Sequence, residues 1–273
     1  MRVLLAAPST TARLHNLVPL AWALRTAGHD VKIAGEPSFV AEILTTGCVA
    51  ADFEPAEFAE LWRPRVVVAD AAVPAGAEVV RLRGPLDESG PGFDTVPPSL
   101  RDPVADARPI RHVPYFGPVE VPGWLRRKAR RSRVLLSLTD ATLAGPVFDA
   151  VAGLDAEVVW ATDPASIPAG VTMPPNVRLV DAAPPAAVLP TCTALIHDGD
   201  ASLALAAAAY GLPQLSLTET PIAARIAAVG AGYVGPAAAV AELGSLRGAA
   251  EALREEIAAL PAPRAVAAEL AGA

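Results

Sequence analysis

Short apolar runs alternate with amphipathic helical patterns along much of this chain. The first apolar run, residues 3–7, is followed by a segment in which apolar residues recur at helical spacing from 17 to 24. Gly28 ends that helix just before the next apolar run, residues 31–34. A buried strand, a helix and a second buried strand in this order predict a parallel βαβ unit.

The same alternation continues, stops, and then restarts. In the first stretch it predicts helices over 38–45 and 56–62 and strands over 66–69 and 78–82. Residues 84–123 are rich in proline and glycine and lack periodicity, which predicts an irregular connector. After it, the predicted strands are 134–138, 158–160, 177–180, 194–196 and 214–217, and the predicted helices are 146–152, 202–210, 222–229, 243–260 and 264–270.

Two such stretches predict an α/β protein with two doubly wound, Rossmann-like domains facing a cleft. The expected division is a shortened N-terminal domain (residues 1–108), a connector (109–133) and a C-terminal domain with terminal helices (134–273). Because ligands bind beyond the carboxyl ends of parallel strands, the loops that follow the strands are the expected functional segments.

Composition narrows the class of protein. A chain of 273 residues with 52% hydrophobic residues can build two cores, and its net charge of −7 argues against a nucleic-acid partner. No apolar run is long enough to cross a bilayer, so a soluble protein with no membrane association is expected. Cys48 and Cys192 are isolated, which favours a reducing cytoplasm, and the excess of arginine over lysine is typical of a GC-rich, actinobacterial genome.

Four stretches carry a resemblance to a known family. They are residues 15–31 (HNLVPLAWALRTAGHDV), 96–101 with 112–118 (VPPSLR and HVPYFGP), 178–192, and 196–199 (IHDG). In this order they resemble the bacterial glycosyltransferases that attach deoxysugars from TDP donors to macrolides, aromatic polyketides and enediynes. The resemblance implies a GT-B-like fold whose first domain binds the acceptor and whose second domain binds the nucleotide sugar.

The resemblance also locates a catalytic base. An inverting transferase of this family uses a histidine after the first strand to deprotonate the acceptor hydroxyl, and Arg13 stands at that position. An arginine cannot act as a base near neutral pH. His15 is the candidate substitute, with Asp70 as the group that would orient it, but the stronger interpretation is structural: His15 begins the first helix and Asp70 ends a strand.

The donor motif departs further from the family pattern. Where the family has H-H-G-G-x-G-T, this chain has His197, Asp198, Gly199 and Asp200, and the last two positions are Ser202 and a leucine. Two carboxylates beside a pyrophosphate would repel it. Ser202 is interpreted either as a donor at the helix terminus or as the N-cap of that helix.

Three further features belong to the same interpretation. Thr139 lies in the loop that contacts the phosphate in the family. Glu219 is the one candidate for binding the sugar hydroxyls. The segment after Gly84 is short where the family carries an insertion that builds the acceptor pocket. We expect no metal site and no cofactor.

The sequence leaves three functions open, and with them the question of whether the chain is an enzyme. One is an active inverting glycosyltransferase that moves a deoxysugar from TDP to an aglycone hydroxyl. The second is a non-catalytic relative, or pseudoenzyme, that binds a pathway intermediate of polyketide antibiotic biosynthesis or assists a partner glycosyltransferase. The third is an enzyme repurposed for another reaction on such an intermediate. The degraded motifs favour the last two together, and the expected partners are a natural-product intermediate, a TDP-sugar, and either a second copy or a partner transferase.

Overall fold

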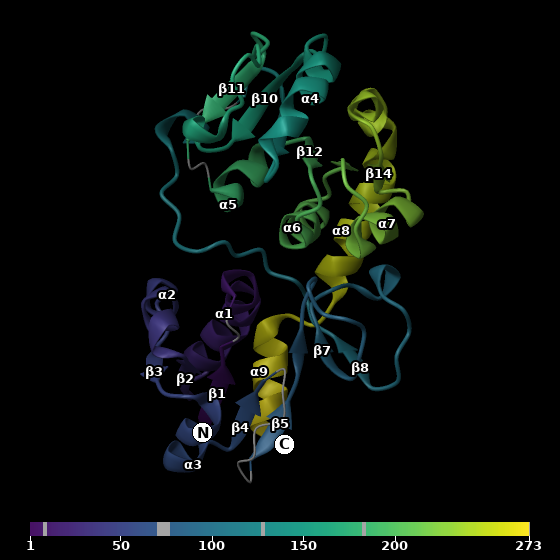
Figure 1. Ribbon diagram of the computed structural model, residues 1–273. Coiled ribbons are helices and arrows are strands. Elements are labelled where there is room, and N and C mark those ends of the chain that lie inside the picture. The colour runs from purple at the N-terminus through teal and green to yellow at the C-terminus, as the bar shows by residue number, and fades with distance from the viewer. Residues whose placement is uncertain (8–9, 70–76, 127–128, 182–183, 273) are drawn as a thin grey trace. The chain divides into compact units, whose positions relative to one another are not determined.

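The chain divides into two units, and each is built around one parallel sheet. In this computed structural model the described residues are 1–7, 10–69, 77–126, 129–181 and 184–272. The first unit comprises Met1–Pro118 and Ala259–Ala273, and the second comprises Val119–Ala258 (Figure 1). Residues 259–273 therefore belong to the first unit, whereas the sequence predicted a C-terminal domain of 134–273.

The sheet of the first unit has the strand order β3-β2-β1-β4-β5, with every neighbouring pair parallel. The chain adds β2 and β3 on one side of β1 and then crosses to add β4 and β5 on the other side, which is the doubly wound pattern. Its strands are β1 (Arg2–Ala6), β2 (Asp30–Gly35), β3 (Ala50–Asp52), β4 (Val66–Val68) and β5 (Glu78–Val80). Among them, β3 was missed because its three residues form no apolar run.

The helices of the first unit include the last helix of the chain. They are α1 (Thr11–Thr26), η1 (Pro37–Phe39), α2 (Val40–Thr45), α3 (Pro55–Trp62), η2 (Pro98–Leu100) and α9 (Pro263–Gly272). Gly28 has φ +86°, so it provides the left-handed backbone that follows the end of α1. Helix α9 packs against α1, and the backbone N–H of Arg111 donates to the Pro261 carbonyl over 2.8 Å.

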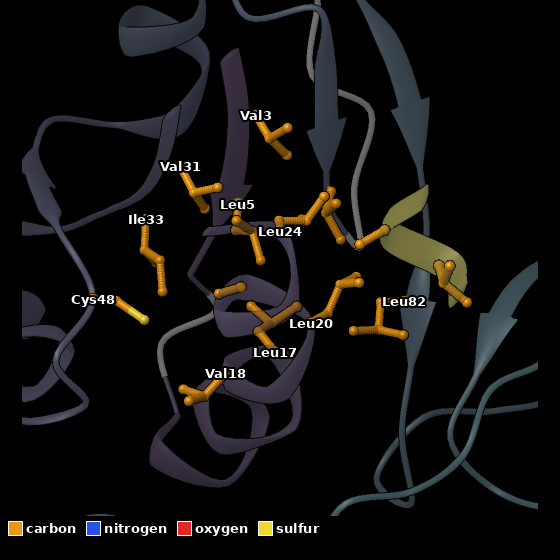
Figure 2. Packing of buried hydrophobic residues seen from close by; sticks show 14 of the residues in the cluster. Val3, Leu5, Leu17, Val18, Leu20, Leu24, Val31, Ile33, Cys48 and Leu82 are labelled. Carbon is orange, nitrogen blue, oxygen red and sulfur yellow. The ribbon is translucent and has the colours of Figure 1, made fainter. Parts of the chain in front are cut away.

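One apolar cluster joins these elements (Figure 2). Side chains of Val3 and Leu5 from β1 meet Leu20 and Leu24 of α1, and all four are at most 1% exposed. The α9 side chains Val266, Ala267 and Leu270 belong to the same cluster. The C-terminal helix is thus part of the core of the first unit.

A small sheet of parallel pairs follows β5, and two of its three strands lie in the segment predicted to be irregular. Its strands are β6 (Leu82–Arg83), β7 (Gly92–Asp94) and β8 (Ala107–Pro109), in the order β6-β7-β8. Arg101 orders the surrounding loops, because its guanidinium donates to the Asp94 carboxylate over 2.9 Å and to the Gly84 carbonyl over 2.6 Å. Hydrogen bonds to a charged group, rather than a periodic apolar pattern, organise this segment.

The sheet of the second unit has six parallel strands in the order β11-β10-β9-β12-β13-β14. They are β9 (Ser132–Ser137), β10 (Ala156–Ala161), β11 (Val177–Val180), β12 (Ala194–His197), β13 (Gln214–Ser216) and β14 (Gly232–Val234). The helical segments are η3 (Gly123–Arg126), η4 (Ala141–Leu143), α4 (Ala144–Val151), η5 (Pro164–Ser166), α5 (Pro185–Val188), η6 (Leu189–Thr191), α6 (Ala201–Ala209), α7 (Pro221–Ala228), η7 (Ala237–Leu246) and α8 (Arg247–Ala259).

Strand order reverses between β9 and β12, because the chain adds β10 and β11 on one side of β9 and then crosses to β12 on the other. This reversal is the topological switch point of the sheet, where open α/β sheets bind ligands. No helix within the described ranges is long and apolar enough to span a membrane.

Candidate functional site

The loops that follow β9 and β12 leave the switch point of the second sheet side by side. In the parallel register of the two strands, Ser137 pairs with His197. Thr139 therefore lies two residues beyond Ser137, and Asp198 lies one residue beyond His197. This register places the loop residues predicted from the sequence at one edge of one sheet.

The Asp198 side chain joins these two loops. Its Oδ2 accepts the backbone N–H groups of Thr139 and Asp140 over 2.6 and 2.8 Å, and its Oδ1 accepts the Thr139 hydroxyl over 3.4 Å. Asp140 has its own local role, since its carboxylate accepts the hydroxyl and the N–H of Thr142, and these bonds lower the pKa of Asp140. Asp198 is thus an acceptor for backbone donors of a neighbouring loop.

Asp200 caps the helix that follows β12. Its Oδ1 accepts the backbone N–H of Leu203 over 2.9 Å, and its extended backbone (φ −61°, ψ 110°) precedes the first helical residue of α6. Ser202 is the second residue of α6, so the interpretation of Ser202 as the N-cap is wrong. An aspartate at this position satisfies an unpaired N–H and also places a negative charge at the positive end of the helix.

His197 and Gly199 fix the turn between the strand and the helix. The imidazole of His197 is 1% exposed, and its Nδ1 accepts the Gly199 N–H over 3.1 Å, so the neutral ring carries its proton on Nε2. Burial lowers the pKa of His197 to about 4, against the opposing charges of Asp200 and Asp198. A neutral imidazole cannot supply a positive charge to a diphosphate. Gly199 has φ +109°, and a Cβ there would lie 2.8 Å from Cγ2 of Thr220.

Glu219 lies at the same edge of the sheet, between β13 and α7, and is exposed. Five of the predicted residues, Thr139, Asp198, Gly199, Asp200 and His197, are connected through hydrogen bonds or sequence adjacency at the switch point. Among the described residues, no group of three or more histidine, cysteine, aspartate and glutamate side chains is placed to hold a metal ion.

In the first unit, the Arg13 guanidinium forms an ion pair with the carboxylate of Asp87. Its Nη2 lies 2.7 Å from Oδ1 of Asp87, whose other oxygen accepts the backbone N–H of Gly84 over 2.8 Å. Arg101 also donates to the Asp87 carbonyl over 2.5 Å. Arg13 therefore binds the short segment that follows Gly84.

His15 lies in α1, two residues after Arg13, and its ring packs against an aromatic side chain. Its ring centroid is 5.0 Å from that of Tyr115 at an interplanar angle of 80°, and Tyr115 is in turn 5.0 Å from Trp22. Burial lowers the pKa of His15, and the charge of Glu42 opposes this shift. The imidazole is accordingly neutral near pH 7 and has a free electron pair for a proton, as a general base requires.

Two residues of this environment were not predicted as site residues. Asp87 lies in a short polar segment with no motif, and Tyr115 contacts His15 from a position 100 residues away in the sequence. Neither contact has a local sequence signal. Asp70, predicted to orient His15, lies outside the described residues.

Comparisons with known proteins identify relatives along the chain. Residues 146–272 match the family model described as "Erythromycin biosynthesis protein CIII-like, C-terminal domain". The chain is 30% identical to the TDP-daunosamine transferase DnrS of Streptomyces peucetius, over 80% of each protein. That alignment spans 346 residues, so it includes positions at which this 273-residue chain has no counterpart, and the chain is shorter than its relatives.

Solved structures show the same similarity. The structure titled "Spinosyn Forosaminyltransferase SpnP" matches with a TM-score of 0.87 and 26% identity, covering 100% of this chain and 98% of the other. The glycosyltransferase VinC, solved in complex with DTDP, matches with a TM-score of 0.86 and 25% identity, covering 100% of this chain and 99% of the other. The expected α/β architecture with parallel sheets and the GT-B similarity are confirmed.

Proposed function

This chain belongs to the bacterial antibiotic TDP-deoxysugar glycosyltransferase family, and we propose that it transfers a deoxysugar from a TDP donor to a hydroxyl of a polyketide-type aglycone. The observation that carries the proposal is the similarity to sugar transferases over the whole chain, with both parallel sheets intact. The transfer interpretation, the first of the three functions left open by the sequence, receives more support from the relatives than the other two.

His15 supplies the chemistry that the acceptor side needs. In the proposed step its imidazole takes the proton of the acceptor hydroxyl while the oxygen attacks the anomeric carbon of the sugar. The bond between that carbon and the phosphate oxygen breaks, and its electron pair leaves with TDP, so the configuration at the carbon inverts. A neutral His15, held at a defined angle by Tyr115, supports this role.

The test is release of TDP that depends on both substrates. Purified protein is incubated with TDP-deoxysugars and polyketide aglycones, and TDP and the glycoside are quantified by chromatography and mass spectrometry. We expect the two products in equal amounts, and His15→Ala is expected to slow transfer by about 10²- to 10⁴-fold, the usual contribution of a general base.

His29→Gln is the matched control, because His29 lies at the surface near the N-terminus, where Met1 contacts its ring. If wild-type protein and His29→Gln release TDP while His15→Ala releases it at the same rate, His15 is not the base. If no protein releases TDP with any donor and acceptor, the transfer function is refuted.

A second candidate function follows from the site itself. In this function the protein no longer transfers sugar. It instead binds or acts on a natural-product intermediate, or it assists a partner transferase or a second copy of the chain. The observation that favours it is that Arg13, Asp198 and Asp200 are each engaged by this chain's own groups. The thermal stability of the protein distinguishes the two functions: stabilisation by TDP supports a donor site, whereas stabilisation by aglycones alone supports the second candidate.

A further inference from the structure

We infer that the carboxylate of Asp198 is a built-in competitor for the donor diphosphate, so that this one side chain determines how tightly the second unit binds a nucleoside diphosphate. The inference rests on the proposed function, because it concerns the affinity of the same donor. It assigns Asp198 a role in specificity, and no catalytic step depends on it.

The first argument is the convergence of two donors on one oxygen. Consecutive backbone N–H groups, those of Thr139 and Asp140, both point to Oδ2 of Asp198 at 2.6 and 2.8 Å. Two successive amides directed at one point form an anion-binding concavity, and phosphate oxygens occupy such concavities in proteins. The carboxylate oxygen is chemically a stand-in for a phosphate oxygen at this position.

The second argument is position. Both amides lie in the loop after β9, Asp198 lies directly after β12, and these are the two strands between which the strand order reverses. Ligands of open α/β sheets bind beyond the carboxyl ends of the strands at this place. The stand-in anion thus lies where the fold itself favours a ligand, and it takes the donors that an anionic ligand would need.

The third argument is charge. A diphosphate that binds at the switch point must displace the Asp198 carboxylate from both amides and then remain close to its charge. Asp200 adds a second negative charge two residues away, at the start of α6. Removing the carboxylate at 198 frees two hydrogen-bond donors and removes one repulsive charge, so both effects act in the same direction.

The experiment compares binding of three probes by calorimetry: TDP, inorganic pyrophosphate and thymidine. Asp198→Ala removes the acceptor, and Asp198→Asn removes the charge while keeping a side chain of the same shape. We expect both variants to bind TDP and pyrophosphate at least about tenfold more tightly than wild-type protein, with thymidine affinity unchanged. If the Asp198 carboxylate competes with phosphate, only the two probes that carry phosphate should bind more tightly. A general loosening of the loop would not separate these two probes from thymidine.

Asp155→Asn is the matched control. It removes one negative charge from the same unit, but Asp155 precedes β10, at the amino-terminal end of the strands, where it pairs with Arg131. Its affinities for all three probes are expected to equal those of wild-type protein. Circular dichroism and the unfolding midpoint of each variant establish that the unit is folded, and Asp198→Asn serves as the test if Asp198→Ala is destabilised.

The outcomes separate this inference from the proposed function. If Asp198→Asn and Asp198→Ala bind TDP no more tightly than wild-type protein, the inference is overturned, whether or not wild-type protein transfers sugar. If the variants bind TDP more tightly but neither they nor wild-type protein release TDP from a sugar donor, the inference stands and the transfer function fails.

Discussion

Acid is expected to destabilise this protein through two buried histidines, and His112 gives the cleaner test. Both ring nitrogens of His112 are buried and have no hydrogen-bond partner in the part of the chain that the structure describes. Burial lowers the pKa of His112 from 6.5 to about 4, since the charged ring would lose its hydration without compensation. His197, in the other unit, has a pKa lowered to about 4 by the same cause.

The sign follows from proton linkage. Because the folded pKa lies below the unfolded one, the unfolded chain binds protons first as the pH falls from 6.5 toward 4. The stability contributed by a neutral His112 is complete above the unfolded pKa and is lost through this window. Between pH 7 and pH 5 the loss amounts to about 2 kcal/mol for one such histidine.

The perturbation is His112→Phe, which keeps a planar ring and removes both unpartnered nitrogens. Urea unfolding is measured at pH 7 and pH 5, with hydrogen exchange of first-unit peptides to assign the transition to that unit. At pH 7 we expect His112→Phe to be as stable as wild-type protein or more stable by about 1 kcal/mol, since no buried polar group is left unpaired. From pH 7 to pH 5 the variant is expected to lose about 2 kcal/mol less than wild-type protein.

Replacement of His29 by glutamine is the control, since it removes a histidine at the surface near the N-terminus. Because desolvation and the N-terminal charge also lower the pKa of His29, the loss of stability of this variant between the two pH values is expected to lie below that of wild-type protein, but by less than for His112→Phe. Equal losses for wild-type protein and His112→Phe would refute the reasoning, because they would mean that a charged imidazole is tolerated at position 112 without cost.

Three further substitutions test a turn, an ion pair and a packing contact near the two sheets. Gly199→Ala is expected to destabilise the second unit by about 2 kcal/mol in urea unfolding, because φ +109° is strained for alanine and its Cβ would meet Thr220. Glu157→Gln is expected to cost about 2 kcal/mol in the same assay, since it removes the carboxylate 2.9 Å from Arg133, whose side chain is only 4% exposed. Leu270→Ala is expected to cost about 2 to 5 kcal/mol and to speed hydrogen exchange in α1, because Leu270 is 3% exposed in the core of the first unit.

Matched controls separate each cause from a general effect of mutation. Gly153→Ala places a Cβ where no atom lies within 4 Å, so its midpoint should equal that of wild-type protein. Asp155→Asn breaks an ion pair whose side chains are 63% and 88% exposed, and the expected loss is below about 0.5 kcal/mol. Ala271 borders Leu270 and is only partly buried, so Ala271→Ser should leave exchange in α1 unchanged. Any control that destabilises as much as its partner would contradict the assigned cause.

Much of the architecture could be predicted because buried parallel strands need continuous apolar runs. The runs that became β1, β2, β4, β9 and β12 are of this kind, and each lies inside a sheet. The strands that were missed, β3, β7, β8 and β14, have three residues each and no apolar period. The prolines at 261 and 263 predicted a change of direction before α9, but its packing partner depends on the complementary apolar faces of α1 and α9, which no local pattern specifies.

The residues of the candidate site could be located from the sequence, but their contacts could not. The resemblance named Thr139 and Asp198 as separate candidates, and their hydrogen bond joins positions 59 residues apart. The sequence suggested repulsion between Asp198 and a phosphate, whereas the structure adds that the carboxylate already holds two amides. Local capping chemistry left two equal interpretations of Ser202, an N-cap or a donor at the helix terminus, whereas the N-cap is Asp200, two residues earlier.

Three charged residues of the candidate segments, Arg13, Asp198 and Asp200, share one physical property: each has a partner within the chain. Arg13 forms an ion pair with Asp87, in the segment that follows Gly84. The Asp198 carboxylate accepts two backbone N–H groups of the loop after β9. A lone exchange of Arg13 for histidine would leave Asp87 without its ion pair, so the two positions are coupled and must be varied together to recover a base there. His15, which needs no such exchange, is therefore the simpler candidate for proton transfer, and Asp198 is the simpler place at which to change the donor affinity of this protein.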